Sequence, residues 1–171
     1  RLMKKVAIFA SGNGSNAQRL AEHFKGHDRI SVSLILCNKP GAYVLERAKI
    51  LGIPSVLFSR DEFNSGDKVA QVLREQGIDY LVLAGFLWLI PSYLLKSHPN
   101  RIINIHPALL PKFGGKGMYG LRVHESVIAA GETTTGITIH LVNEVYDEGR
   151  ILFQASCPVL EEDTPESLAS R

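Results

Sequence analysis

Two polar side chains at alternate positions, Asn104 and His106, are the residues of this chain best placed to do chemistry. They end an apolar run and precede Pro107, which cannot extend a strand ladder and so predicts the end of a strand. Because residues two apart in a strand share a face, the amide and the imidazole are expected to act on one reacting atom. Such a pair can stabilise and protonate a developing oxyanion. The alternative is a hydrogen-bonded structural histidine.

A glycine-rich turn at residues 11–16, Ser-Gly-Asn-Gly-Ser-Asn, is the second candidate. Its glycines allow a tight turn, and the N-terminus of the helix that follows offers unpaired N–H groups to a phosphate. Together with Ala17 the turn matches the dinucleotide pattern G-x-G-x-x-G/A, but Cys37 and Asn38 stand where that pattern needs an acidic residue. The turn therefore predicts a site for a monophosphate, with a plain strand-to-helix turn as the alternative.

Three further features could complete a site. The loop at residues 85–91, Gly-Phe-Leu-Trp-Leu-Ile-Pro, is too apolar to lie in water, so its backbone could flank a flat heteroaromatic ring, or it could be a core segment. Asp147 lies in a turn, where its carboxylate either favours the protonated form of His106 or only shapes the turn. Lys112 is either a second phosphate contact or an ordinary solvated charge.

Composition and charge argue against several partners. The 171-residue chain has a formal net charge of +2 and no cluster of Lys and Arg interleaved with aromatic residues, so we expect no nucleic-acid partner. The longest apolar stretch, residues 80–91, is shorter than a membrane span, and no signal peptide is recognised before the first strand, so we expect no membrane partner. His98, His124 and His140 lack metal-binding spacing, so no metal is expected.

The two cysteines, Cys37 and Cys157, each lie inside an apolar strand-like run. This placement predicts reduced core residues in a cytoplasmic protein, although a disulfide is the alternative. No G-x-S-x-G pattern supports serine hydrolysis.

The hydrophobic pattern that must position these candidates predicts an α/β fold. Strand-like runs alternate with helical patterns, which favours βαβ units and a single-domain, Rossmann-like three-layer sandwich with a mainly parallel sheet. Helical patterns cover residues 17–24, 45–51 and 69–73, and Gly52 and Gly77 stand where C-caps are expected. The predicted strands are residues 6–10, 31–36, 55–58, 80–84, 101–105, 136–142 and 151–156.

The later part of the chain differs in character. Polar and apolar residues alternate over residues 133–140, so the last strands are expected to be antiparallel and more exposed. Four glycines within residues 111–123 predict a mobile loop that could act as a lid. Residues 163–166 are typical of a capped helix start with proline in the first turn. We therefore expect residues 1–171 to form one domain whose C-terminal helix is truncated.

Four segments taken together resemble the phosphoribosylglycinamide (glycinamide ribonucleotide) formyltransferase family, in order and spacing along nearly the whole chain. The Asn-x-His-x-x-Leu-Leu-Pro segment is shared by the wider folate-dependent formyltransferase superfamily, whereas the Ser-Gly-Asn-Gly-Ser-Asn turn narrows the match to the purine enzymes. The segments are residues 11–16, 84–86, 104–111 and 147–149.

The resemblance implies a role for each segment. Asn104, His106 and Asp147 would be catalytic, and Gly14, Ser15 and Asn16 would bind the phosphate of the ribonucleotide. The pterin of the folate would lie against two loops, whose residues are Leu87, Trp88, Leu89, Ile90, Val142, Asn143, Glu144, Val145 and Tyr146. The formyl group would pass from the cosubstrate 10-formyltetrahydrofolate to the amino group of glycinamide ribonucleotide without a metal. A cytoplasmic monomer or homodimer is expected.

Three rival functions remain open at this point. A formyltetrahydrofolate deformylase would use the same three catalytic side chains on water, but its family carries an N-terminal regulatory domain. A methionyl-tRNA formyltransferase would need an arginine-glycine loop where Lys112-Phe113-Gly114-Gly115 stands. A non-catalytic dinucleotide-binding module would need the missing acidic residue.

Overall fold

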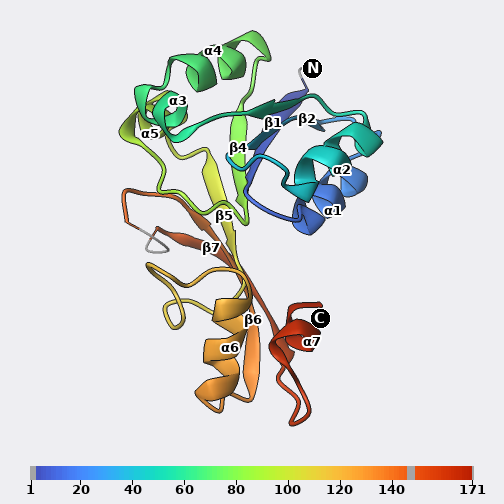
Figure 1. Ribbon diagram of the computed structural model, residues 1–171, viewed down its shortest axis with the longest axis vertical. Coiled ribbons are helices and arrows are strands. Elements are labelled where there is room, and N and C mark those ends of the chain that lie inside the picture. The colour runs from blue at the N-terminus through green and yellow to red at the C-terminus, as the bar shows by residue number, and fades with distance from the viewer. Residues whose placement is uncertain (1–2, 146–148, 171) are drawn as a thin grey trace. The chain divides into compact units, whose positions relative to one another are not determined.

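A seven-stranded, mostly parallel sheet runs through the computed structural model, which describes residues 3–145 and 149–170 (Figure 1). The strand order is β3-β2-β1-β4-β5-β6-β7. All seven predicted strands are present, with ends that differ by at most two residues from the prediction. The strands are β1 Lys4–Ala10, β2 Ile30–Cys37, β3 Ser55–Leu57, β4 Tyr80–Ala84, β5 Ile102–His106, β6 Thr134–Leu141 and β7 Ile151–Pro158. Contacts divide the chain into two compact units, Arg1–Ile103 and Asn104–Arg171.

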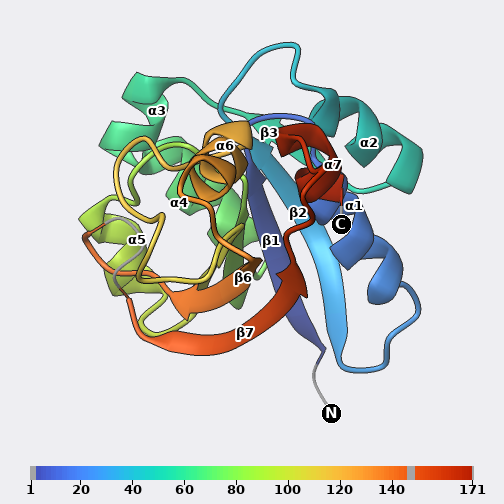
Figure 2. The ribbon, with the colours of Figure 1, turned by 90° about the horizontal axis from the view of Figure 1, so that it is seen from below.

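The first unit is a three-layer α/β arrangement. β2 pairs in parallel with β1 and β3, and β1 pairs in parallel with β4, which confirms the parallel βαβ arrangement predicted by the alternating pattern. The resulting strand order is doubly wound. Figures 1 and 2 show α1 and α2 on one face of these strands and α3, α4 and α5 on the other. The helices are α1 Ser15–His23, α2 Tyr43–Leu51, α3 Arg60–Ser65, α4 Asp67–Glu75 and α5 Ser92–Ser97.

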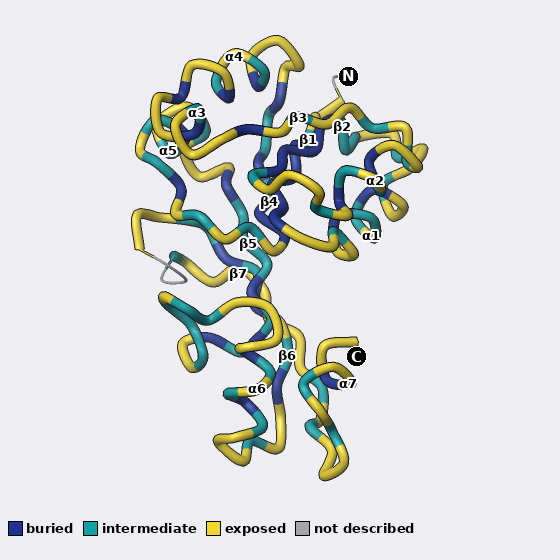
Figure 3. Tube along the Cα trace, viewed as in Figure 1, coloured by how far each residue is buried: buried dark blue, intermediate teal, exposed yellow. Residues whose placement is uncertain are grey.

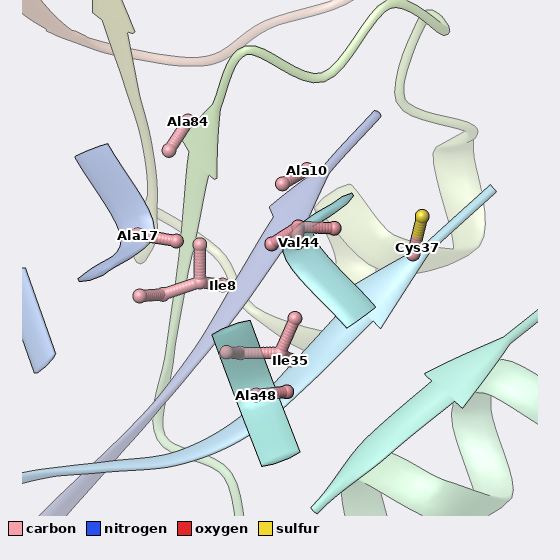
Figure 4. Packing of buried hydrophobic residues seen from close by; sticks show 8 residues of the cluster. All are labelled: Ile8, Ala10, Ala17, Ile35, Cys37, Val44, Ala48 and Ala84. Carbon is pink, nitrogen blue, oxygen red and sulfur yellow. The ribbon is translucent and has the colours of Figure 1, made fainter. Parts of the chain in front are cut away.

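Alternate residues of β1 build the two faces of this unit. Ile8 and Ala10 are buried against Ala17 of α1 and Val44 of α2, in the cluster shown in Figure 4. Between them, Phe9 points to the opposite face, where rings from other segments surround it. Figure 3 shows how the buried residues of the first unit gather on its strands. Both faces of β1 are therefore covered, which fixes its carboxyl end, where the glycine-rich turn begins.

A capping box starts α3, a short helix that the hydrophobic pattern did not predict. The backbone N–H of Ser59 donates to Oε1 of Glu62 at 2.8 Å, and the backbone N–H of Glu62 donates to Oγ of Ser59 at 3.2 Å. The helix delivers Phe63 to the ring cluster under the loop that follows β4. Two reciprocal hydrogen bonds therefore replace the partners that a free helix end lacks.

We expect Ser59→Ala to lower the free energy of unfolding by about 0.5–2 kcal/mol, because the substitution removes the side-chain acceptor of this cap. Urea denaturation followed by circular dichroism would measure the change. Ser59→Asp is the matched control, since aspartate also accepts from a helix N-terminus and should retain most of the stability. Equal losses in the two variants would contradict the capping role.

The second unit contains the β6–β7 hairpin with α6, Leu121–Ala129, and α7, Pro165–Ser170, which pack against each other. β6 and β7 are antiparallel, as the alternation over residues 133–140 predicted. α7 begins at Pro165 as predicted, and Oγ1 of Thr164 accepts from the N–H of Ser167 at 3.1 Å. The predicted loop at residues 111–123 was too long by three residues, because α6 begins at Leu121 and buries Val123.

No helix within residues 3–145 and 149–170 is long and apolar enough to cross a membrane.

Candidate functional site

The glycine-rich turn joins β1 to α1 through a left-handed residue. Gly14 has φ 79° and ψ 20°, and its carbonyl accepts the first helical hydrogen bond, from the N–H of Gln18, at 2.9 Å. Ser15 and Asn16 form the exposed first turn of α1, and no side chain of the described residues caps this helix start. The N–H groups of the first turn therefore point out at the positive end of the helix dipole, as a phosphate site requires.

Arg47 of α2 holds the turn from the side. Its Nε donates to the carbonyl oxygen of Asn13 at 2.7 Å, and a terminal guanidinium nitrogen donates to Oδ1 of the same residue at 2.5 Å. The other terminal nitrogen donates to Oε1 of Gln18. Arg47 therefore places a positive charge beside the N-terminus of α1, where the helix dipole is also positive. Its hydrogen bonds fix the backbone of the turn. No sequence pattern indicated Arg47, because it lies 34 residues from Asn13.

Ser11 connects the turn to the loop after β4. Its backbone N–H donates to the carbonyl of Gly85 at 3.1 Å, and its buried Oγ accepts from the N–H of Leu87 at 3.0 Å. β1 and β4 are adjacent parallel strands, so both segments leave the sheet at its carboxyl edge. Ligands of doubly wound sheets bind at this edge, where the strand order reverses.

The loop after β4 has exposed leucine side chains and half-buried aromatic ones. Leu87 and Leu89 are 37% and 43% exposed, whereas Ile90 is buried. Trp88 contacts the ring of Phe58 at 5.9 Å between centroids, and the guanidinium of Arg60 lies 4.1 Å above the indole. The side chains of Leu87 and Leu89 could therefore cover a flat ligand, whereas Ile90 is buried and can offer only its backbone groups. Trp88 is half-buried and packed against other rings.

Asn104 lies on β5 and is held by a histidine of β6. Its Nδ2 is 3.0 Å from Nε2 of His140, and Nδ1 of His140 is 3.0 Å from the carbonyl oxygen of Leu141. An amide nitrogen can only donate and a carbonyl can only accept, so Nε2 of His140 accepts from Asn104 and Nδ1 donates to Leu141. His140 is therefore the acceptor that orients the Asn104 amide, a role that its spacing in the sequence did not indicate.

His106 ends β5 with its ring buried, only 3% exposed. Its Nε2 lies 2.7 Å from the carbonyl oxygen of Phe113. Because the carbonyl can only accept, Nε2 carries a proton and donates it to this hydrogen bond. The structure thus presents an imidazole fixed through Nε2, two residues along the strand from the Asn104 amide.

His124 of α6 interacts electrostatically with His106. Its pKa is lowered, first because burial disfavours the charged imidazolium and second because charge on His106 repels it. Among the described residues, Nδ1 of His124 is buried and has no hydrogen-bond partner. The neutral form of His124 is therefore the one that this packing accommodates.

We expect acid to destabilise the protein partly through His124. A lowered pKa in the folded state means that the unfolded chain, in which histidine titrates near about 6.5, binds the proton more tightly. The stabilising contribution is therefore complete above that pH and is lost as the pH falls through the folded-state pKa. Urea unfolding between about pH 8 and about pH 5 should show a smaller loss of stability in His124→Asn than in the wild type. His23→Asn, at an exposed position of α1, should behave like the wild type.

The structure describes only some of the remaining residues that were predicted to bind the substrates. Val142 is half-buried, whereas Asn143, Glu144 and Val145 are exposed, and Oδ1 of Asn143 accepts from the N–H of Val145 at 2.8 Å. Tyr146 and Asp147 lie outside the described residues. Nζ of Lys112 lies 3.1 Å from Oε2 of Glu132, which makes it part of an exposed ion pair. Within residues 3–145 and 149–170, no group of three or more acidic, cysteine or histidine side chains could hold a metal ion.

Comparisons with known proteins agree on one family. Residues 4–171 match the sequence profile of the formyl transferases. The chain is 45% identical over 174 residues to the chloroplastic phosphoribosylglycinamide formyltransferase of Arabidopsis thaliana, covering 98% of this chain but 60% of the relative. It is 38% identical to the phosphoribosylglycinamide formyltransferase of Bacillus subtilis, covering 99% of this chain and 87% of the relative.

A solved structure extends the similarity to the fold. The crystal structure of phosphoribosylglycinamide formyltransferase from Anaplasma phagocytophilum superimposes with a TM-score of 0.89 at 38% identity, covering 99% of this chain and 79% of that one. The chain spans about three fifths of the length of the plant relative. Similarity therefore covers almost all of this chain.

Proposed function

The chain belongs to the formyl transferase family, with phosphoribosylglycinamide formyltransferases as its relatives, and we propose that it transfers the formyl group of 10-formyltetrahydrofolate to the amino group of glycinamide ribonucleotide. The reaction would serve purine biosynthesis. The observation that carries the proposal is the pair of Asn104 and His106 at the end of β5, each with one polar atom fixed by a hydrogen bond. Such preorganised donors are what a developing oxyanion requires.

The proposed reaction has two stages, attack of the amine on the formyl group and collapse of the tetrahedral intermediate. The amine nitrogen attacks the formyl carbon, which forms the new C–N bond and puts a negative charge on the formyl oxygen. The amide of Asn104, which His140 orients, would donate to this oxyanion together with the imidazole of His106. Collapse breaks the bond to N10 of the folate, which takes a proton while the amine loses one. Asp147 would order a water for that transfer.

The first unit would hold the two substrates. The N–H groups of Gly14, Ser15 and Asn16 would bind the phosphate, supported by the dipole of α1 and by the charge of Arg47. The exposed faces of Leu87 and Leu89 fit a pterin ring, with the backbone of residues 87–90 as its hydrogen-bonding edge. Both cysteines are free thiols, which supports a cytoplasmic location.

The proposal is tested by supplying 10-formyltetrahydrofolate with and without glycinamide ribonucleotide. We expect release of tetrahydrofolate only when the amine is present, in equal amount to the formylated ribonucleotide. Release that is indifferent to the amine would identify a deformylase instead. Titration with a reduced nicotinamide dinucleotide is the control for a dinucleotide-binding module, and the absence of an acidic residue near Cys37 predicts no specific binding.

A further inference from the structure

Two side chains of the β6–β7 hairpin hold the backbone of the segment that follows His106. Oγ1 of Thr138 donates to the carbonyl of Ala108 at 2.7 Å and accepts from the N–H of Leu110 at 3.0 Å. Nε2 of Gln154 donates to the carbonyl of Leu110 at 3.0 Å and to Oγ1 of Thr138 at 2.9 Å. Thr138 and Gln154 lie opposite each other in the register of β6 and β7, so their side chains share a face. We call this pair the hairpin bracket.

The bracket leaves no hydrogen-bonding capacity of the Thr138 hydroxyl unused. A hydroxyl offers one donor and two acceptor positions, and three of the four hydrogen bonds above use all of them. The side chain is 0% exposed, so water cannot replace a lost partner. Removing the hydroxyl would therefore leave a buried backbone N–H and a buried carbonyl without their present partners.

The held segment lies between the candidate catalytic residue and the carbonyl that binds it. Leu110 is four residues after His106 and three before Phe113, whose carbonyl accepts from Nε2 of His106 at 2.7 Å. The stretch from His106 to Phe113 is thus closed at its two ends by this hydrogen bond and fixed in its middle by the bracket. Displacement of Leu110 would move the Phe113 carbonyl and, with it, the orientation of the imidazole.

We propose that Thr138 and Gln154 are positioning residues for the formyl transfer, which hold Ala108 and Leu110 and so keep the Phe113 carbonyl in place against His106. The proposal rests on the proposed function and adds two residues to its machinery that do not touch the substrates. A misplacement of about 1 Å at a reacting group costs up to about 100-fold in rate. The loss should therefore appear in kcat, while the KM of each substrate stays close to the wild-type value.

The same strand supplies a matched control. Thr135 of β6 is also buried, and its Oγ1 has no hydrogen-bond partner among the described residues. Thr138→Val and Thr135→Val make the same change in shape and remove the same hydroxyl, three residues apart. Only the first breaks the bracket, so their difference separates positioning from the general effect of a buried Thr→Val substitution.

The experiment compares the steady-state kinetics, thermal unfolding and imidazole NMR spectra of these two variants. We expect Thr138→Val to lower kcat by about 10–100-fold and to shift the Nε2 resonance of His106, and Thr135→Val to do neither. Thr138→Ser, which restores the hydroxyl, should recover most of kcat. Equal kinetic effects of the two valine variants, or an unshifted His106 resonance in Thr138→Val, would overturn the proposal.

A milder variant covers the case in which Thr138→Val does not fold. Gln154→Met removes the amide donor at an exposed position and leaves the Thr138 hydroxyl in place. It should fold, lower kcat less than Thr138→Val and shift the His106 resonance, whereas no shift would count against the bracket. If the wild type transfers no formyl group, the proposed function fails, but the His106 resonances of the variants still show whether the bracket holds the imidazole.

Discussion

His106→Ala is expected to lower kcat for formyl transfer by about 10²–10³-fold, which corresponds to roughly 2.7–4 kcal/mol of transition-state stabilisation. The imidazole is buried and fixed through Nε2 to the Phe113 carbonyl, so it is preorganised to act on the reacting group. A donor that strengthens its contact only as negative charge develops contributes to kcat more than to substrate binding. The KM values of both substrates should therefore change much less than kcat.

Steady-state kinetics with varied ribonucleotide and folate would measure this loss. His23→Ala, at an exposed position of α1, is the matched control and should keep wild-type turnover. His106→Asn sharpens the interpretation, because asparagine supplies a donor but cannot exchange a proton. Its activity should lie between those of the wild type and the alanine variant. Near-normal turnover in His106→Ala would remove the histidine from the mechanism.

The strands of this fold could be predicted because burial imposes a simple pattern on them. Residues 34–37 of β2 are all buried, as expected of a strand covered on both faces, and the sequence shows an uninterrupted apolar run there. α3 escaped prediction because Phe63 is its only buried residue, so no helical periodicity exists over six residues. Its signal was local instead, a serine followed three residues later by a glutamate.

The candidate site could be predicted only where its residues are neighbours in the chain. Asn104 and His106 share a strand, so spacing alone indicated them. Their supports come from far along the sequence: His140 lies 36 residues from Asn104, and Thr138 lies 28 residues from Leu110. A hydrogen bond between such residues exists only after β6 has paired in its final register, which no local pattern encodes.

The loop after β4 shows a second kind of limit. Its composition indicated an apolar segment that either binds a ligand or lies in the core, and in the structure exposed and packed side chains alternate along it. Leu87 and Leu89 face outward, whereas Trp88 packs among phenylalanine rings contributed by other segments. Which of two adjacent apolar residues faces inward depends on the shape of the cavity that the rest of the fold leaves, so the sequence could not decide it.

Gly14→Ala is the second substitution with a large expected effect, on binding of the ribonucleotide. A Cβ at this position would lie 2.6 Å from Cβ and 2.9 Å from the backbone Cα of Val44, a residue fully buried in the cluster of Figure 4. Because one of these atoms belongs to the backbone, a rotamer change of Val44 cannot relieve the clash. Either α2 or the first turn of α1 must move.

Such a movement would disturb the N–H groups that are proposed to bind the phosphate. Each hydrogen bond to a charged group contributes about 1.5–3 kcal/mol, so the loss of one weakens binding by about 10–100-fold. Calorimetric titration with the ribonucleotide should show this weakening, and thermal unfolding should show a loss of stability as well. Folate binding should change less, because Ser11, rather than Gly14, connects the turn to the loop after β4.

Gly26→Ala separates the clash with Val44 from the cost of the backbone conformation. Gly26 has φ 73°, close to the 79° of Gly14, but a Cβ there would meet nothing within 4 Å. Both variants carry the left-handed strain of about 1–2 kcal/mol, yet only Gly14→Ala adds the contact with α2. Gly26→Ala should therefore lose stability and keep its affinity for the ribonucleotide. Equal affinity in the two variants would show that the close approach of the turn to Val44 is not what shapes the phosphate site.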